Sequence, residues 1–207
     1  CDVTSITVEC WGGGGAGAGT SANGAGPGGG GAGGAYARRT FTVTGGQSIT
    51  YFVGSGGFGN RNSPSNSGTA TWFDNNTLLN ASGGAGATQN PTFNIGAFGS
   101  TPVCVGTVVL PGGNGATAIT TSGAGGTGGS GTGLGGAGGA SVGTGGGVGN
   151  DGTSPGGGGS GAYVNNNTDR SGGSGGVGGI RITYTSTLQT YCAPNFSTVE
   201  PISNVTY

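Results

Sequence analysis

Glycine is the residue that most constrains how this chain can fold. It occupies 58 of the 207 positions, and the long glycine-rich run 12–34 contains nothing larger than Asn, Thr or Pro. Glycine has no side chain to bury, and on folding it loses about 0.5–1 kcal/mol more in conformational freedom than alanine does. A conventional hydrophobic core can therefore account for only part of any fold, and a specific backbone structure must compensate for the rest.

Charged side chains are also scarce in this sequence. Only 5% of the residues are charged, and five arginines against six acidic residues leave a net charge of -1. Such a chain has no field to attract nucleic acid or an anionic membrane, so we expect neither partner. No apolar run has the length of a membrane span, and we expect no membrane insertion. The same composition is typical of flexible linkers, which is the alternative to a folded domain.

Short segments rich in β-branched and aromatic residues predict strands, because their side chains alternate between two faces. In 5–11, Ile6, Val8 and Cys10 share one face, and Thr7, Glu9 and Trp11 share the other. Gly45 and Gly46 predict a turn that makes a hairpin of 36–44 and 47–56. No segment has the apolar spacing of a helix. The predicted strands are 5–11, 36–44, 47–56, 69–74, 77–82, 102–110 and 178–186.

A different period governs the glycine-rich segment 112–161. Its larger residues recur at every third position, and three residues per turn is the repeat of the polyproline II helix, which has no internal hydrogen bonds. We expect such helices to pack side by side, with bare glycine on two edges and the larger residues on an exposed or inter-layer edge. The residues that mark this third edge are Ala124, Thr127 and Ser130, then Leu134, Ala137 and Ala140.

Four cysteines in a chain without His, Lys or Met suggest an oxidising compartment and disulfides that support a thin core. Cys1 and Cys10 flank one extended run and so lie on the order of 20 Å or more apart, which is beyond disulfide reach. The remaining possibilities join Cys1 or Cys10 to Cys104 or Cys192. We therefore expect a secreted, extracellular or cell-surface protein whose export signal was cleaved or lies outside this chain.

Several blocks of this sequence occur in an order that resembles a known family. They are VTSITVECWGGGGAGAG, GGGGAGGAYARRTFTVTGGQSITYFVGSGG, GTVVLPGGNGA, PGGGGSGAY and GGSGGVGGIRITYT. Together they resemble the glycine-rich domain of large secreted surface proteins of gliding bacteria that use type IX secretion, and a similar module occurs in phage tail-fibre tips. The resemblance covers residues 3 to 185 and implies a domain 1–185, with 186–207 as a linker or the start of a following module.

Catalytic chemistry has few candidates in this sequence. Without His, the usual general base and the triads built on it are missing, and the six acidic residues are scattered without motif spacing. Asn150, Asp151 and Gly152 resemble part of a calcium loop, although such a triplet is more often a turn. We expect no enzyme activity, no metal and no cofactor. Trp11, Tyr36 and Trp72 are candidate surface or stacking aromatics, with burial in the core as the alternative.

These observations predict an all-β fold, a β-sandwich or sheet whose glycine-rich loops gather into a polyglycine II bundle. The expected function is that of a structural and adhesive module of a secreted bacterial cell-surface or extracellular filament protein. The alternatives are an ice-binding or other flat-surface recognition protein and a phage receptor-binding tip. Candidate partners are other copies of the chain, neighbouring modules of the same protein and surface glycans.

Overall fold

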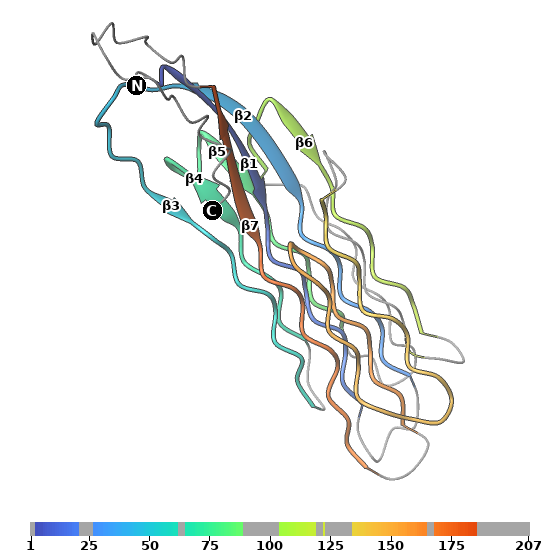
Figure 1. Cartoon of the computed structure of the whole chain (residues 1–207). Helices are drawn as coiled ribbons and strands as arrows, with labels where there is room; N and C mark the ends of the chain where they lie inside the picture. The colour runs from blue at the N-terminus through green and yellow to red at the C-terminus, as the bar shows by residue number, and fades with distance from the viewer. Residues whose placement is uncertain are drawn as a thin grey trace, which may run out of the picture.

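The fold is all-β. A computed structural model describes residues 3–20, 27–61, 65–88, 104–118, 122, 134–164 and 168–185, and among them there are strands but no helix (Figure 1). The strands in chain order are β1 (Ser5–Trp11), β2 (Tyr36–Thr42), β3 (Tyr51–Phe52), β4 (Thr71–Phe73), β5 (Leu79–Ala81), β6 (Val108–Leu110) and β7 (Gly179–Tyr184).

The strands form two antiparallel sheets that pack against each other at one end of the molecule. One sheet has the order β6-β2-β1-β7 and the other β3-β4-β5. Strand β1 is central to the first sheet, with Val8 opposite Arg39 on β2 and Ile182 on β7. The sheets enclose a small core, to which β1 contributes the face that carries Ile6, Val8 and Cys10. The core residues are Ile6, Val8, Cys10, Ala37, Phe73, Leu79 and Ala81.

The predicted hairpin of 36–44 with 47–56 is wrong. The turn itself forms, because Gln47 N donates to Thr44 O over 3.0 Å and Gly46 takes a left-handed φ of 79°. The chain beyond it crosses to the second sheet, where β3 pairs with β4. Both edges of β2 are already occupied, by β1 and β6, so no edge remains for the returning segment.

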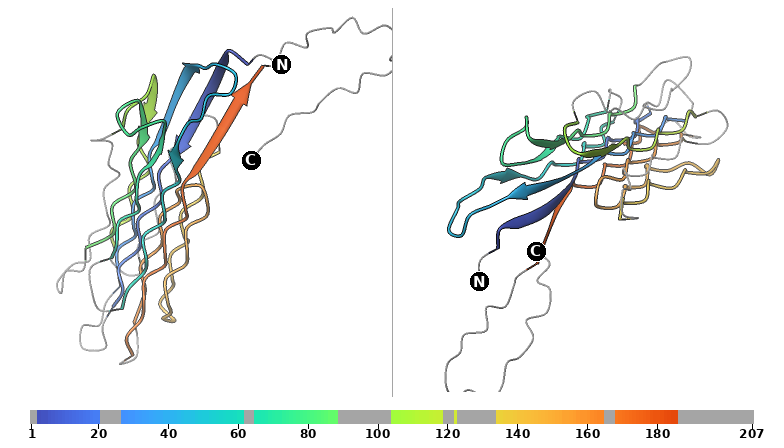
Figure 2. Two further views of the ribbon diagram at one scale, coloured as in Figure 1. Left: turned by 90° about the vertical axis from the view of Figure 1, so that its left-hand side faces the viewer. Right: turned by 90° about the horizontal axis from the view of Figure 1, so that it is seen from above.

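Glycine-rich stretches run on from the strands toward the opposite end of the molecule, side by side (Figures 1 and 2). We call these stretches rods. Hydrogen bonds between backbones join them, and they comprise residues 12–20, 28–35, 54–60, 65–69, 82–88, 112–118, 134–140, 147–153, 156–162 and 171–178.

Rod 12–20 is bonded to neighbours on every side. Its N–H groups donate over 2.8 to 3.0 Å, and the acceptor changes to another rod at each successive residue, with a period of three. A helix with three residues per turn and no internal bonds directs its N–H groups in this way. Residues 12, 15 and 18 donate to rod 28–35, residues 13 and 16 to rod 65–69, and residues 14 and 17 to rod 171–178.

Rod 28–35 repeats the pattern with other partners. Residues 28, 31 and 34 donate to rod 156–162, residues 30 and 33 to rod 112–118, and residues 32 and 35 to rod 82–88. Glycine allows this spacing, because a Cβ added at Gly31 would overlap the carbonyl oxygen of Gly15. Each bond contributes about 1 kcal/mol, the same order as the extra entropy that a glycine loses on folding.

The expected third edge is present in rod 134–140. Leu134, Ala137 and Ala140 are exposed, while Gly136 and Gly139 are buried and donate to rod 156–162 and its preceding turn. The other marker residues, Ala124, Thr127 and Ser130, lie outside the described residues. The glycine-rich run 12–34 has no repeat that predicts its edges. It nevertheless contains rod 12–20 and all but the last residue of rod 28–35, and both rods have neighbours on all sides.

Adding one methyl group to a central rod should disrupt the array. The Cβ of Gly15→Ala would overlap the carbonyl oxygen of Ala85 on a neighbouring rod, so we expect a loss of about 3 kcal/mol or more in the free energy of unfolding. Gly143→Ala is the matched control, because nothing lies within 4 Å of its added Cβ, and it should leave stability unchanged or raise it by about 0.5 kcal/mol. Urea unfolding measures both, and equal tolerance would contradict close packing.

Candidate functional site: an exposed strip and a buried carboxylate network

Two of the three candidate surface aromatics are buried. Trp11 is 3% exposed and Tyr36 is fully covered, with ring centroids 5.3 Å apart. They lie on the face of the first sheet that points away from the core. Gly179 lies between the Trp11 ring and Pro155, since a Cβ at this glycine would contact both. Neither ring can serve as a surface platform. Trp72 is half-buried and stacks on the more exposed Phe52.

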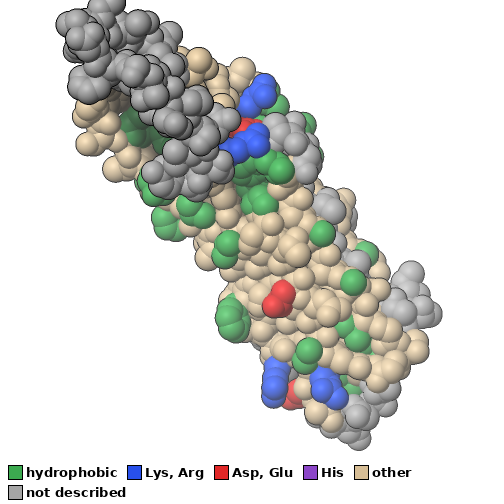
Figure 3. All heavy atoms as spheres, viewed as in Figure 1, with side chains coloured by type: hydrophobic (Ala, Val, Ile, Leu, Met, Phe, Trp, Pro, Cys, Tyr) green, Lys and Arg blue, Asp and Glu red, His purple; other side chains and the backbone are tan. Residues whose placement is uncertain are grey.

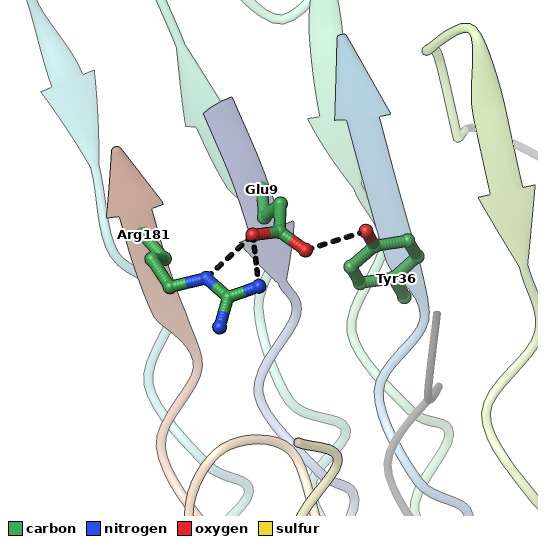
Figure 4. A network of polar contacts seen from close by, with 3 residues as sticks. All are labelled: Glu9, Tyr36 and Arg181. Carbon is green, nitrogen blue, oxygen red and sulfur yellow. Dashed lines mark hydrogen bonds and ion pairs between the residues drawn. The ribbon is translucent and has the colours of Figure 1, made fainter. Parts of the chain in front are cut away.

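A buried carboxylate lies beside the Tyr36 ring (Figure 4). Glu9 is 2% exposed in the middle of β1, and one of its carboxylate oxygens accepts from the guanidinium of Arg181 on β7. Its other oxygen accepts from the hydroxyl of Tyr36 on β2 over 2.8 Å. The network thus joins the three neighbouring strands β2, β1 and β7. Strand alternation predicted the face on which Glu9 lies but not its partner, 172 residues further along the chain.

Burial changes the titration of two groups in this region. Desolvation, with the nearby Glu9 carboxylate adding to it, raises the pKa of the Cys10 thiol to about 12. Desolvation and the hydrogen bond to Glu9 raise the pKa of Tyr36 to about 12 as well. Cys10 therefore stays a neutral thiol at physiological pH, which makes it a packing residue and not a nucleophile.

The predicted disulfides find no support in the part of the chain that the structure describes. Cys10 and Cys104 are both free thiols. Cys10 lies in the core, whereas the Cys104 sulfur accepts a hydrogen bond from the backbone N–H of Ser82 over 3.2 Å. The two cysteines therefore lie in different environments. Cys1 and Cys192 lie outside the described residues. The prediction that Cys1 and Cys10 are not bonded to each other therefore stays a prediction.

Large exposed side chains gather on the segment that continues from β3 into rod 54–60. Phe52 is 46% and Phe58 71% exposed, and exposed Ser55 lies midway between them. At three residues per turn these residues share one edge of the rod. Gly54 and Gly57 are buried on a second edge, while a Cβ on Gly56 would overlap rod 171–178 from the third.

The adjoining segment 65–73 presents a matching edge. Trp72, Thr69 and Asn66 also follow one another at intervals of three, and the last two are exposed. Two rungs link the edges: the rings of Phe52 and Trp72 lie 6.1 Å apart with an angle of 20° between their planes, and the hydroxyls of Ser55 and Thr69 are 3.3 Å apart. We call these two edges, Phe52–Ser55–Phe58 and Trp72–Thr69–Asn66, the strip.

The strip is neutral, since residues 50–58 and 65–73 contain no charged side chain. The wider surface has the same character, and the face shown in Figure 3 consists largely of backbone and uncharged polar atoms. Sequence reasoning singled out Trp72 but missed Phe52 and Phe58. The signal that could have found them is the three-residue spacing of Phe52, Ser55 and Phe58 between glycines.

Metal chemistry has no obvious place among the described residues, because no three acidic or cysteine side chains come together there. Asp151, considered above as part of a calcium loop, uses its carboxylate to accept from the backbone N–H of Ser174 over 2.7 Å. It therefore links rod 147–153 to the middle of rod 171–178. Within the same residues no helix has the length and apolar character needed to cross a bilayer.

The fold and its surface define a glycine-rich β domain, in which two small sheets continue into an array of hydrogen-bonded rods. A family model described as glycine-rich domain matches residues 2–185, and the chain belongs to that family. The match agrees with the resemblance in its glycine-rich character and extent. A search of curated proteins found no match.

Removing the buried carboxylate or one of its hydrogen-bond partners should lower the free energy of unfolding more than removing an exposed contact on β1. Glu9→Ala leaves the partly buried Arg181 guanidinium without its carboxylate, and we expect a loss of about 3–5 kcal/mol in unfolding free energy. Tyr36→Phe removes one hydrogen bond and should cost about 1–2 kcal/mol. Thr7→Ala, which removes only an exposed hydroxyl contact to Thr40, should cost less than about 1 kcal/mol. Equal losses in all three variants would contradict this ranking.

Stability should fall in alkaline solution. Below pH 9 both raised groups are neutral in the folded and the unfolded chain. Above pH 9 the unfolded Cys10 thiol ionises while the folded one keeps its proton, and Tyr36 follows above pH 10. Each group then lowers the unfolding free energy by up to about 1.4 kcal/mol per pH unit until about pH 12. Urea unfolding at pH 8–10.5 should show a shallower fall between pH 9 and 10 in Cys10→Ala, and parallel curves would contradict the assignment.

Proposed function

We propose that this domain is a non-enzymatic structural and adhesive module of a secreted bacterial cell-surface or extracellular filament protein. The observation that carries the proposal is the strip, an exposed row of aromatic and hydroxyl side chains held on rods that are hydrogen-bonded to their neighbours. Exposed apolar surface of this kind often marks a contact site. The rods hold it in a fixed geometry, which lowers the entropy cost of binding.

The uncharged surface supports the adhesive part of the proposal. With few charges to hydrate, such a surface contacts a neutral target without the cost of removing water from ions. The acidic groups of the described residues favour a structural role, because Glu9 and Asp151 both hold parts of the fold together. The secreted location is supported by the order of the sequence blocks that resemble secreted surface proteins. The cysteine content suggested the same location, but Cys10 and Cys104 are free thiols and add no support.

Beads that carry the domain should adhere to surfaces under flow. We expect at least tenfold more of them to remain on alkyl-silanised glass and on a cellulose film than beads coated with a neutral globular protein of the same size. Immunoblots of the fractionated source bacterium should detect the protein on the cell surface or in the medium. Equal retention of both kinds of beads would reject the adhesive role, and a purely cytoplasmic protein would reject the location.

A further inference from the structure

The strip combines two kinds of exposed group in a regular order. At one end Phe52 and Trp72 form a cross-strand pair whose rings stack with 20° between their planes, so that the half-buried Trp72 supports the more exposed Phe52 ring. Ser55 and Thr69 follow as a hydroxyl pair, and Phe58 adds a third ring. Six residues at about 3.1 Å each separate Phe52 from Phe58, which gives a strip of about 19 Å.

Each rung is held by the backbone beneath it. Ser55 N donates to the Thr69 hydroxyl over 2.8 Å, and Thr69 N donates to Ser55 O over 2.9 Å. Gly57, just before Phe58, donates to Gly14 of the central rod. The side chains of the strip therefore project from fixed positions, and aromatic rings with two rotatable bonds lose little freedom on binding.

The chemistry of the strip selects one class of partner. A nucleic acid or an acidic polymer needs several cations; residues 50–58 and 65–73 offer none, and the next three-residue step beyond Phe58 adds the single exposed Arg61. Aromatic faces take up flat C–H surfaces, whereas the hydroxyls of Ser55 and Thr69 and the amide of Asn66 exchange hydrogen bonds with a polar ligand. A neutral oligosaccharide presents both, with C–H groups on the ring faces and hydroxyls at the rim.

We infer that the strip is a binding site for neutral glycan chains, which lie along it with sugar rings stacked on Phe52 and Phe58, while Trp72 supports the Phe52 ring from beneath. This inference rests on the proposed adhesive function and names its target. Sugar hydroxyls bond to Ser55 and Thr69 between the two aromatic positions. The uncharged protein surface matches the uncharged ligand.

Tryptophan fluorescence offers a direct test, because Trp72 lies in the strip while Trp11 is buried. Cellotetraose, chitotetraose, maltotetraose and mannotetraose are titrated separately into the full chain, with tetragalacturonate as the charged counterpart. We expect saturable binding of at least one neutral tetrasaccharide and at least tenfold weaker binding of tetragalacturonate. Saturation-transfer NMR on the same samples reports which sugar protons contact the protein.

Variants locate the site. Phe52→Ala and Phe58→Ala should each weaken binding at least tenfold and together abolish it, and Ser55→Ala should weaken it about threefold. All three side chains are exposed, so circular dichroism should be unchanged. Tyr184→Ala is the matched control, an aromatic with the same exposure as Phe52 that lies on β7 outside the strip, and it should bind as the unchanged protein does.

Two results would overturn the inference: failure of all four neutral tetrasaccharides to bind, or full binding by the Phe52→Ala, Phe58→Ala double variant. The bead assay separates these from failure of the proposed function. If beads carrying the double variant still adhere to alkyl-silanised glass while no tetrasaccharide binds, adhesion stands and the glycan site is rejected. If tetrasaccharides bind but beads do not adhere, the site stands and the adhesive role is rejected.

Discussion

The close approach of one backbone to another is the interaction on which this structure depends. Rod 12–20 has neighbours in all directions because residues 12–19 are all glycine or alanine, and at Gly15 even a methyl group would overlap the carbonyl oxygen of Ala85. Hydrogen bonds between rods hold this part of the molecule together, as contacts between apolar side chains do in an ordinary protein interior. The small core between the sheets anchors one end, and β1 runs directly into the central rod, so the sheet register also sets the rod register.

This constraint decides where larger side chains can lie. In a rod enclosed on two edges, bulk is tolerated only on the third, and that edge is exposed in rods 54–60 and 134–140. Phe52 and Phe58 are on the surface because the packing leaves them no other place. The ionic network around Glu9 lies within β1, in the sheet, where longer side chains fit; the close-packed rod begins three residues further on.

Alternation in 5–11 and the period of three in 134–140 could be read from the sequence, because large residues mark the faces there. The run 12–34 could not, since glycine and alanine leave its edges alike and only the neighbours distinguish them. The hairpin prediction failed because the turn at Gly45 and Gly46 does not specify which sheet the next strand joins. The strip was missed because it begins in a strand and continues in a rod, where the side-chain period changes from two to three.

The pairing of β1 with β7 has a mechanical consequence. Ile6 lies opposite Tyr184, so the described chain enters and leaves the domain at the same end of the molecule, while the rods extend the other way (Figure 1). Tension applied through these two points acts across the ladder, breaking its hydrogen bonds one after another from that pair inward. The rods stay outside the line of force until the ladder has opened. Such a domain projects from a stretched chain as a side branch, and the rods that hold the strip do not bear the applied force.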